Sequence, residues 1–251
     1  MLTNNEAVNS ILQPIIGPWY DSLKNPLKAQ EQILSELTQK YASTDYGKSH
    51  QAEKTATIAQ YQKNFPIINY SSMMPYLAQV KEGNFKAFLP EAPDCWVMTR
   101  GSTGKAKVLP ATPTHLKQIF TCGARGLINY IIKKENFDVF SGVILNLNFP
   151  SSVHTMDQDG KEVTYGYSSG TYARLNPMFD RVSLMPKQEE IDTLGAGIGR
   201  GDWEKRFELV YQKAKDENVT AFGAEHHCFI NFVSALWTVR HNLNLFYFKQ
   251  H

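Results

Sequence analysis

Cysteine is scarce in this chain of 251 residues, which contains only Cys95, Cys122 and Cys228. An odd number without CxxC spacing provides neither a disulfide framework nor a structural zinc site. The Glu-His-His-Cys run at residues 225–228 does not change this expectation, because adjacent residues of a strand or helix point in different directions. We therefore predict no metal site, buried and unreactive cysteines at positions 122 and 228, and a reducing cytoplasm.

An excess of one charge is also missing, since 26 lysines and arginines are balanced by 24 acidic residues and the net charge is +2. No general field therefore attracts nucleic acid or membrane surfaces. The N-terminus lacks the basic and apolar segments of a secretory signal, and no stretch approaches the roughly 18 consecutive apolar residues of a membrane-spanning helix. These absences predict a cytoplasmic protein that recognises its partners through a defined site.

The chain does have enough apolar side chains, 42% of all residues, to fill a sizeable core. Helical patterns dominate its first part: apolar residues recur at helical spacing in residues 27–42, a helix-compatible stretch covers residues 50–63, and a short helix is expected over residues 72–81. Serine, aspartate and glycine in residues 43–50 predict a loop between the first two helices.

Strands and helices alternate after residue 95. Short apolar runs predict strands at residues 95–98, 108–109, 139–149 and 219–222. Thr112 and Pro113 are typical of a helix start, and Asp159-Gly160 predicts a hairpin turn. Later helices are expected over residues 203–216 and about 229–240, and Glu189, Glu190 and Asp192 are interpreted as a solvated helix start.

This order predicts an α/β fold, in which a helical N-terminal segment is followed by a mixed, partly parallel sheet flanked by helices. We expect a single domain over residues 1–251. Residues 1–90 would form a mainly helical lead-in, and residues 91–251 would carry the functional region.

The segment TRGSTGKAK, residues 99–107, lies between two expected strands and has a composition suited to polyphosphate. Glycines let the backbone turn closely around an anion, amide and hydroxyl groups donate to phosphate oxygens, and lysine supplies compensating charge. The P-loop of nucleoside triphosphatases is excluded, because only two residues separate Gly101 from Gly104 and Ala106 follows Lys105. An ordinary flexible hairpin loop is the alternative on composition alone.

The loop resembles the phosphate-binding signature of adenylate-forming enzymes. The preceding residues 65–70 (FPIINY) and 74–77 (MPYL), followed by Gly83, resemble the approach to this loop in the plant auxin-responsive acyl-acid amido synthetases and their microbial relatives. The resemblance covers about residues 60–125 well and continues loosely to about residue 235. It implies the N-terminal portion of a ligase that uses ATP and Mg²⁺ to activate a small carboxylic acid as an acyl-adenylate.

The resemblance implies that the loop cradles the β- and γ-phosphates of ATP through Thr99, Gly101, Ser102, Thr103 and Gly104. Lys107 would stand at the signature lysine. Arg100 departs from the pattern, because a small hydroxyl residue normally occupies its position. Arg100 could add a phosphate contact, or it could mark a loop whose nucleotide binding has drifted.

The resemblance also implies an acyl-acid pocket, for which the candidate residues are Arg125, Tyr165, Tyr167 and His226. The guanidinium of Arg125 could pair with a substrate carboxylate, and the tyrosines could stack on the acyl group. The alternatives are a solvated arginine on an amphipathic helix and tyrosines that serve only strand packing.

Several parts of such an enzyme are absent from this sequence. The resemblance implies an adenine-binding turn, a ribose-binding aspartate and a C-terminal domain, all of which would follow later in a longer chain. We therefore expect little or no turnover from this chain alone, and a missing C-terminal half or a second copy as its partner. The alternatives are a non-catalytic ligand-binding or interaction module on the same scaffold, and an unrelated α/β protein with a chance match in the loop.

Overall fold

The computed structural model describes residues 4–101, 106–180, 182–197, 199–223 and 232–233. Its N-terminal part is helical, as predicted: α1 (Asn4–Lys24), α2 (Pro26–Tyr41), α3 (Asp45–Ser49), α4 (Ile58–Asn64) and α5 (Tyr70–Lys81). Helices α2 to α5 each begin at a capping side chain, which accepts a backbone N–H of the first turn.

Two details of this helical part differ from the sequence-based expectation. The loop prediction for residues 43–50 is wrong, because Thr44 accepts the N–H of Gly47 at 2.9 Å and so starts the short helix α3. The helix expected over residues 50–63 starts only at Ile58, since Gln51 has a left-handed backbone (φ 54°) and Thr57 with Gln60 forms a capping box.

The first sheet has four strands in the order β2-β1-β5-β4. They are β1 (Cys95–Met98), β2 (Val108–Ala111), β4 (His154–Gln158) and β5 (Lys161–Tyr167). Strands β1 and β5 are parallel, whereas β1–β2 and β4–β5 are antiparallel. The predicted hairpin turn is confirmed, because Asp159 and Gly160 both have positive φ angles, 52° and 73°.

The second sheet is entirely parallel, in the order β6-β3-β7. Its strands are β3 (Val143–Asn146), β6 (Leu184–Met185) and β7 (Val219–Gly223). The strand expected over residues 139–149 is shorter than predicted, since Asp138–Phe140 form a 3₁₀ turn and the chain leaves the sheet after Asn146.

Helices pack around these sheets: α6 (Pro113–Lys134), α7 (Ser168–Leu175), α8 (Gln188–Asp192) and α9 (Arg200–Ala214). Thr112 caps α6 as predicted, accepting the N–H of His115. Helix α9 covers one face of β3 through a core cluster that includes Leu145, Leu147 and Val210. The far end of α6 packs against α1 in a second cluster, and Ala221 of β7 also contacts this cluster.

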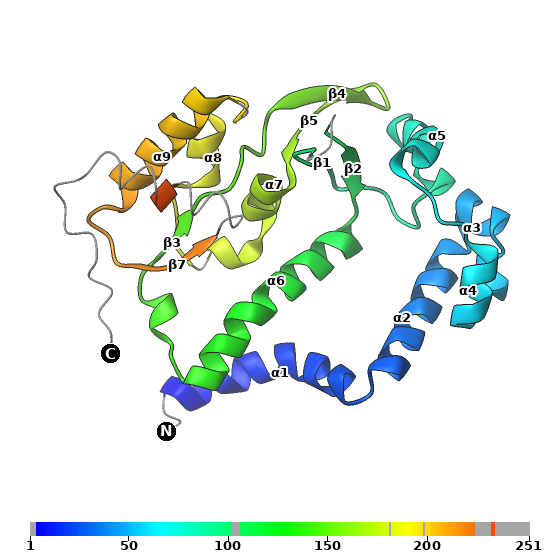
Figure 1. Cartoon of the computed structure of the whole chain (residues 1–251), viewed down its shortest axis with the longest axis horizontal. Coiled ribbons are helices and arrows are strands. Elements are labelled where there is room, and N and C mark those ends of the chain that lie inside the picture. Colours follow the sequence, from blue (N-terminus) through cyan, green and yellow to red (C-terminus); the bar gives the residue numbers. More distant parts are fainter. Residues whose placement is uncertain (1–3, 102–105, 181, 198, 224–231, 234–251) are drawn as a thin grey trace.

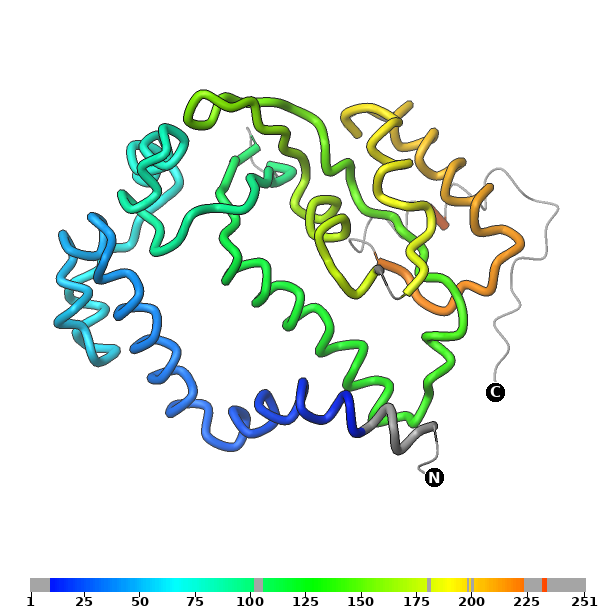
Figure 2. Tube along the Cα trace, turned by 180° about the vertical axis from the view of Figure 1, so that it is seen from behind, coloured from blue at the N-terminus to red at the C-terminus, as the bar shows by residue number. Residues whose placement is uncertain are grey.

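In Figure 1, α2–α5 lie at one end of the molecule and α8–α9 at the other, with the first sheet between them. The view from behind shows α6 running from this sheet to α1 (Figure 2). The fold prediction is therefore confirmed: a helical N-terminal segment is followed by mixed sheets flanked by helices.

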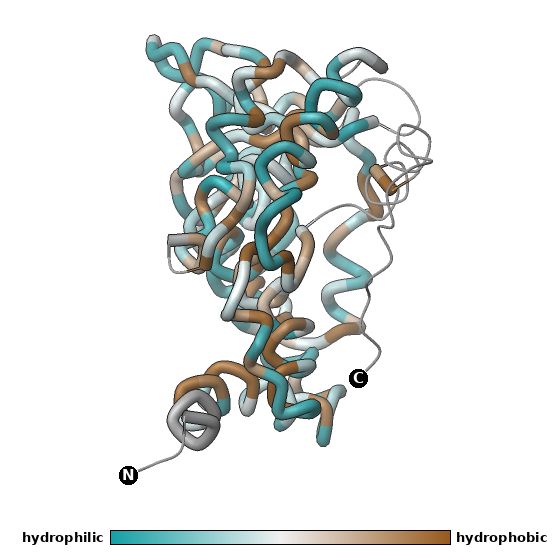
Figure 3. Tube along the Cα trace, turned by 90° about the vertical axis from the view of Figure 1, so that its left-hand side faces the viewer, coloured by the Kyte–Doolittle hydropathy of each residue, from teal (hydrophilic) through white to brown (hydrophobic). Residues whose placement is uncertain are grey.

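Apolar residues are interleaved with polar ones along the described chain, as the short brown stretches of Figure 3 show. No described helix is long and apolar enough to cross a membrane.

Candidate functional site

The ends of two parallel strands meet at the start of the loop of residues 99–107. Met98 of β1 is aligned with Tyr167 of the parallel strand β5, so the chain leaves both strands at the same edge of the sheet. The segment after β3 joins them there, because Tyr167 donates its N–H to the carbonyl of Pro150 at 2.9 Å. Ligands of α/β proteins bind outside the carboxyl ends of parallel strands, and this edge is therefore the candidate site.

The base of the loop is closed by two hydrogen bonds. The N–H of Thr99 donates to the carbonyl of Lys107 at 2.9 Å, and the N–H of Lys107 donates to Thr99 Oγ1 at 3.1 Å. Gly101 has a φ of 67°, a backbone conformation that favours glycine. The predicted phosphate residues Ser102, Thr103 and Gly104 lie outside the described residues.

Lys107 extends from the base of the loop into solvent. Its Nζ lies 5.9 Å from the ring centroid of Tyr70, on α5. The Tyr70 hydroxyl in turn donates to the carbonyl of Val108 at 3.0 Å and accepts its N–H at 3.1 Å. Helix α5 therefore holds the start of β2 through Tyr70, whose ring also lies near the Lys107 ammonium.

The guanidinium of Arg100 lies over an aromatic pair. Its guanidinium carbon lies 4.4 Å from the ring centroid of Phe149 and 5.0 Å from that of Trp203. Arg206 of α9 contacts the same two rings at 4.4 and 4.6 Å and donates from Nη1 to the carbonyl of Asn148 at 3.2 Å. A site role for Phe149, Trp203 or Arg206 was not predicted from the sequence. The local signal is the i, i+3 spacing of Trp203 and Arg206 on one helix face.

Tyr167, a predicted acyl-pocket residue, lies in this same cluster. It is 8% exposed, and its ring centroid is 5.0 Å from that of Phe149. Burial raises the pKa of Tyr167, although the charges of Arg100 and Arg206 oppose the shift and that of Asp202 supports it. The phenol is therefore neutral near pH 7 and can donate a hydrogen bond at the edge where the strands end.

A buried polar network fixes the segment that follows β3. The Asp192 carboxylate accepts the N–H of Ser151 at 2.6 Å and its hydroxyl at 2.5 Å. Gln188, which is 3% exposed, donates from Nε2 to the carbonyl of Phe149 at 3.0 Å and to Asp192 at 3.1 Å. The interpretation of Asp192 as part of a solvated helix start is wrong, because this carboxylate satisfies buried donors 41 residues away in sequence.

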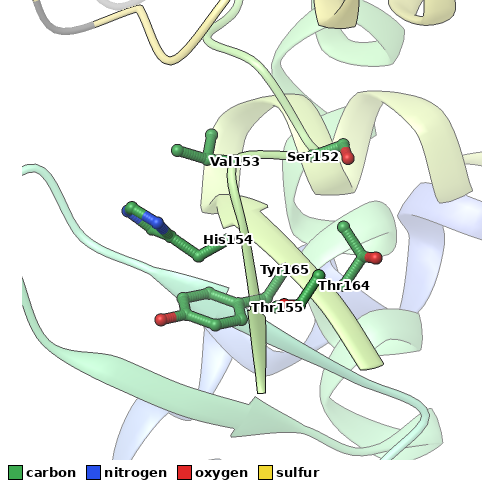
Figure 4. A pocket seen from close by; sticks show the side chains of 6 residues that line it. All are labelled: Ser152, Val153, His154, Thr155, Thr164 and Tyr165. Atoms are coloured by element: carbon green, nitrogen blue, oxygen red, sulfur yellow. The ribbon is translucent and has the colours of Figure 1, made fainter. Parts of the chain in front are cut away.

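Tyr165 lies two residues before Tyr167 and lines a different hollow. This cavity of about 560 Å³ lies between β4, β5 and the residues just before β4. Figure 4 shows the rings of Tyr165 and His154 together beside it, and their centroids are 5.6 Å apart. The cavity is lined by Ser152, Val153, His154, Thr155, Thr164 and Tyr165.

Arg125 lies in the middle of α6, apart from the two tyrosines in its described contacts. Its guanidinium carbon is 5.9 Å from the ring centroid of Trp19 on α1, and Nη1 contacts Cys122 Sγ at 3.5 Å. A substrate role for Arg125 stays a prediction. His226 lies outside the described residues.

The cysteines show no sign of a nucleophile within the described chain. Burial and the charge of Asp94 raise the pKa of Cys95 to about 11, although Arg174 opposes the shift, so this thiol stays protonated near pH 7. The prediction that Cys122 is buried is wrong, because it lies on the solvent side of α6. In the described ranges no three His, Cys, Asp or Glu side chains are grouped to hold a metal ion, and residues 225–228 lie outside them.

The fold and the closed loop define a mixed α/β unit with a candidate phosphate-binding edge. Residues 17–194 match the family model described as the GH3 family N-terminal domain, and the chain therefore belongs to this family. The predicted relationship to the auxin-responsive acyl-acid amido synthetases, N-terminal portion, is thereby confirmed.

Two solved structures share the fold. The structure described as AtGH3.15 acyl acid amido synthetase in complex with 2,4-DB superimposes with a TM-score of 0.64 at 16% identity, covering 94% of this chain and 40% of that one. A second, GH3.15 acyl acid amido synthetase, gives 0.54 at 17% identity, covering 87% of this chain and 36% of that one. The chain thus spans about two fifths of the length of these structures. A search of curated proteins gives no match.

Proposed function

We propose that this chain supplies the phosphate-binding loop and part of the acid-binding region of an ATP-dependent acyl-acid amido synthetase. Membership of the GH3 family supports this proposal, as do the solved structures of acyl acid amido synthetases with the same fold. The single observation that carries it is the loop base, where Thr99 and Lys107 are joined by two hydrogen bonds at the shared carboxyl edge of β1 and β5.

The described residues fit a polyphosphate. Gly101 gives the backbone a close turn, Lys107 is exposed and cationic, and the Thr99 hydroxyl keeps its own proton for donation while its oxygen accepts the N–H of Lys107. ATP with Mg²⁺ would supply the α-phosphate that a substrate carboxylate attacks, with pyrophosphate as the leaving group and an amine or thiol as the later acyl acceptor. The contribution of this chain is to position the phosphates and compensate their charge.

The proposal assigns only part of the reaction to this chain, which spans about two fifths of the solved structures. No described residue takes the part of the adenine-binding turn or the ribose-binding aspartate that the family resemblance implies. The proposal therefore includes a C-terminal half or a second copy as partner, little turnover by this chain alone, and a cytoplasmic location, which rests on composition.

A second candidate function is a non-catalytic ligand-binding module on this scaffold. It is favoured by Arg100, which occupies the place of a small hydroxyl residue and directs its charge onto Phe149 and Trp203. In that case the loop would keep its shape and bind no nucleotide.

Calorimetric titration of the purified chain with Mg-ATP separates these functions. We expect binding that the Ser102→Ala, Lys107→Ala double variant weakens by at least about tenfold, because a hydroxyl donor and a cation are lost. The control is Ser141→Ala, Lys161→Ala, which removes an exposed hydroxyl and an exposed lysine outside the loop. Equal affinity of all three proteins, or no binding by the unaltered chain, would remove ATP from the function.

A further inference from the structure

Arg100 adds a side-chain contact between two parts of the fold, the end of β1 and the segment after β3, which meet through the backbone hydrogen bond from Tyr167 to Pro150. Arg100 lies two residues beyond the end of β1 in the first sheet. Its guanidinium lies over Phe149, in the segment after β3 of the second sheet, and over Trp203 of α9. The two rings pack edge to face, with centroids 5.1 Å apart and an interplanar angle of 78°. A planar guanidinium over aromatic faces is a favourable cation–π arrangement.

Phe149, the aromatic residue beneath Arg100, is also fixed by hydrogen bonds from other elements. Phe149 is 1% exposed; its N–H donates to Ser169 Oγ at 3.3 Å and its carbonyl accepts from Gln188 Nε2 at 3.0 Å. Arg206, 3% exposed, lies over the same rings and donates to the carbonyl of Asn148. Arg100 therefore contacts a rigid part of the protein, whereas its own backbone is at the base of the phosphate loop.

We propose that Arg100 is a positioning residue, whose stack on Phe149 and Trp203 fixes the Thr99–Gly101 arm of the loop for nucleoside triphosphate binding. This inference rests on the proposed function. If a small hydroxyl residue at position 100 served nucleotide binding best, as the family resemblance implies, Arg100→Ser would strengthen binding. A positioning role for Arg100 predicts instead that the same change weakens binding.

The position suits substitution, because Arg100 itself is exposed and its replacement leaves no cavity in the core. Lysine keeps the charge without the planar stack, so Arg100→Lys separates charge from geometry. Arg174→Ser is the matched control, since it removes an exposed arginine at the end of α7.

The first measurement is hydrogen exchange in the free protein. Arg100→Ser should accelerate exchange at the amides of Thr99 and Lys107, whose hydrogen bonds close the base of the loop. Arg100→Lys should give an intermediate exchange rate, and Arg174→Ser should leave the rate at these amides unchanged. Unchanged exchange in Arg100→Ser would overturn the proposal, and this result does not depend on whether the chain binds ATP.

The second measurement is a double-mutant cycle in Mg-ATP affinity. Arg100→Ser and Trp203→Leu should each weaken binding about threefold to tenfold, and the double variant should be no weaker than the worse single variant, because both remove the same stack. Additive losses, or tighter binding by Arg100→Ser, would overturn the proposal. Absence of binding in the unaltered chain would count against the proposed function, and the exchange measurement would then decide whether Arg100 positions the loop.

Discussion

The central strand of the second sheet, β3, and the outer strand of the first sheet, β4, differ in burial, and the difference shows why the loop depends on both sheets. All four residues of β3 in the parallel sheet are buried, whereas β4 in the first sheet has exposed positions along most of its length. A strand buried on both faces, such as β3, is apolar along most of its length, while a hairpin with one solvated face alternates apolar and polar residues. The loop belongs to the first sheet by connectivity, but its Arg100 side chain is supported by the residues after β3.

The largest expected effect comes from breaking the core beneath the second sheet. Leu147 is fully buried in the cluster with Phe207 and Val210. The Leu147→Ala substitution should lower the free energy of unfolding by about 3–4 kcal/mol, because burial is lost and a cavity remains. Leu109→Ala in β2 is the matched change in the first sheet, and should cost only about 1–2 kcal/mol because that residue is partly exposed. Urea unfolding measures both losses of unfolding free energy, and equal losses in the two variants would contradict the comparison.

A smaller effect is expected from the polar network that holds the segment after β3. Asp192→Asn keeps the shape but replaces a carboxylate oxygen that accepts from Ser151 by an amide donor, and should cost about 2 kcal/mol. The control Glu189→Gln changes an exposed carboxylate of the same helix and should be nearly neutral. If chemical denaturation gave equal stabilities for the two variants, Asp192 would not be the support that its contacts indicate.

The smallest effect concerns Glu91, which supports the start of α6 beside the first sheet. Burial alone would raise the pKa of Glu91, but hydrogen bonds from Thr114 and Thr112 lower it below its ordinary value. Its stabilising contribution is therefore complete above the ordinary glutamate pKa and is lost as pH falls through the lowered one. Glu91→Gln should cost about 0.5–1 kcal/mol at pH 7 and almost nothing near pH 3.

Unfolding free energies of Glu91→Gln at these two pH values check this prediction. Glu82→Gln, at the exposed end of α5, is the control. A loss that was larger at pH 3 than at pH 7 would have the wrong sign for a carboxylate that accepts hydrogen bonds in the folded state.

Much of the fold could be predicted because its signals are local. The start of α6 follows from Thr112 and Pro113, whose effect reaches only three residues along the chain, and the β4–β5 turn follows from Asp159 and Gly160. The prediction failed at residues 43–50, where residues typical of a loop also cap a helix, and sequence alone did not decide between the two.

The candidate site also has features that the sequence predicts and features that only the structure shows. Sequence alone determined the loop, its glycines and its family resemblance, because these depend on consecutive residues. Only the tertiary structure placed Arg100 on Phe149 and Trp203 and joined Asp192 to Ser151, since each contact links residues more than 40 positions apart. Such contacts depend on which strands pair in parallel and which faces pack together, and the pairing of β1 with β5 leaves no mark on the residues of either strand by itself.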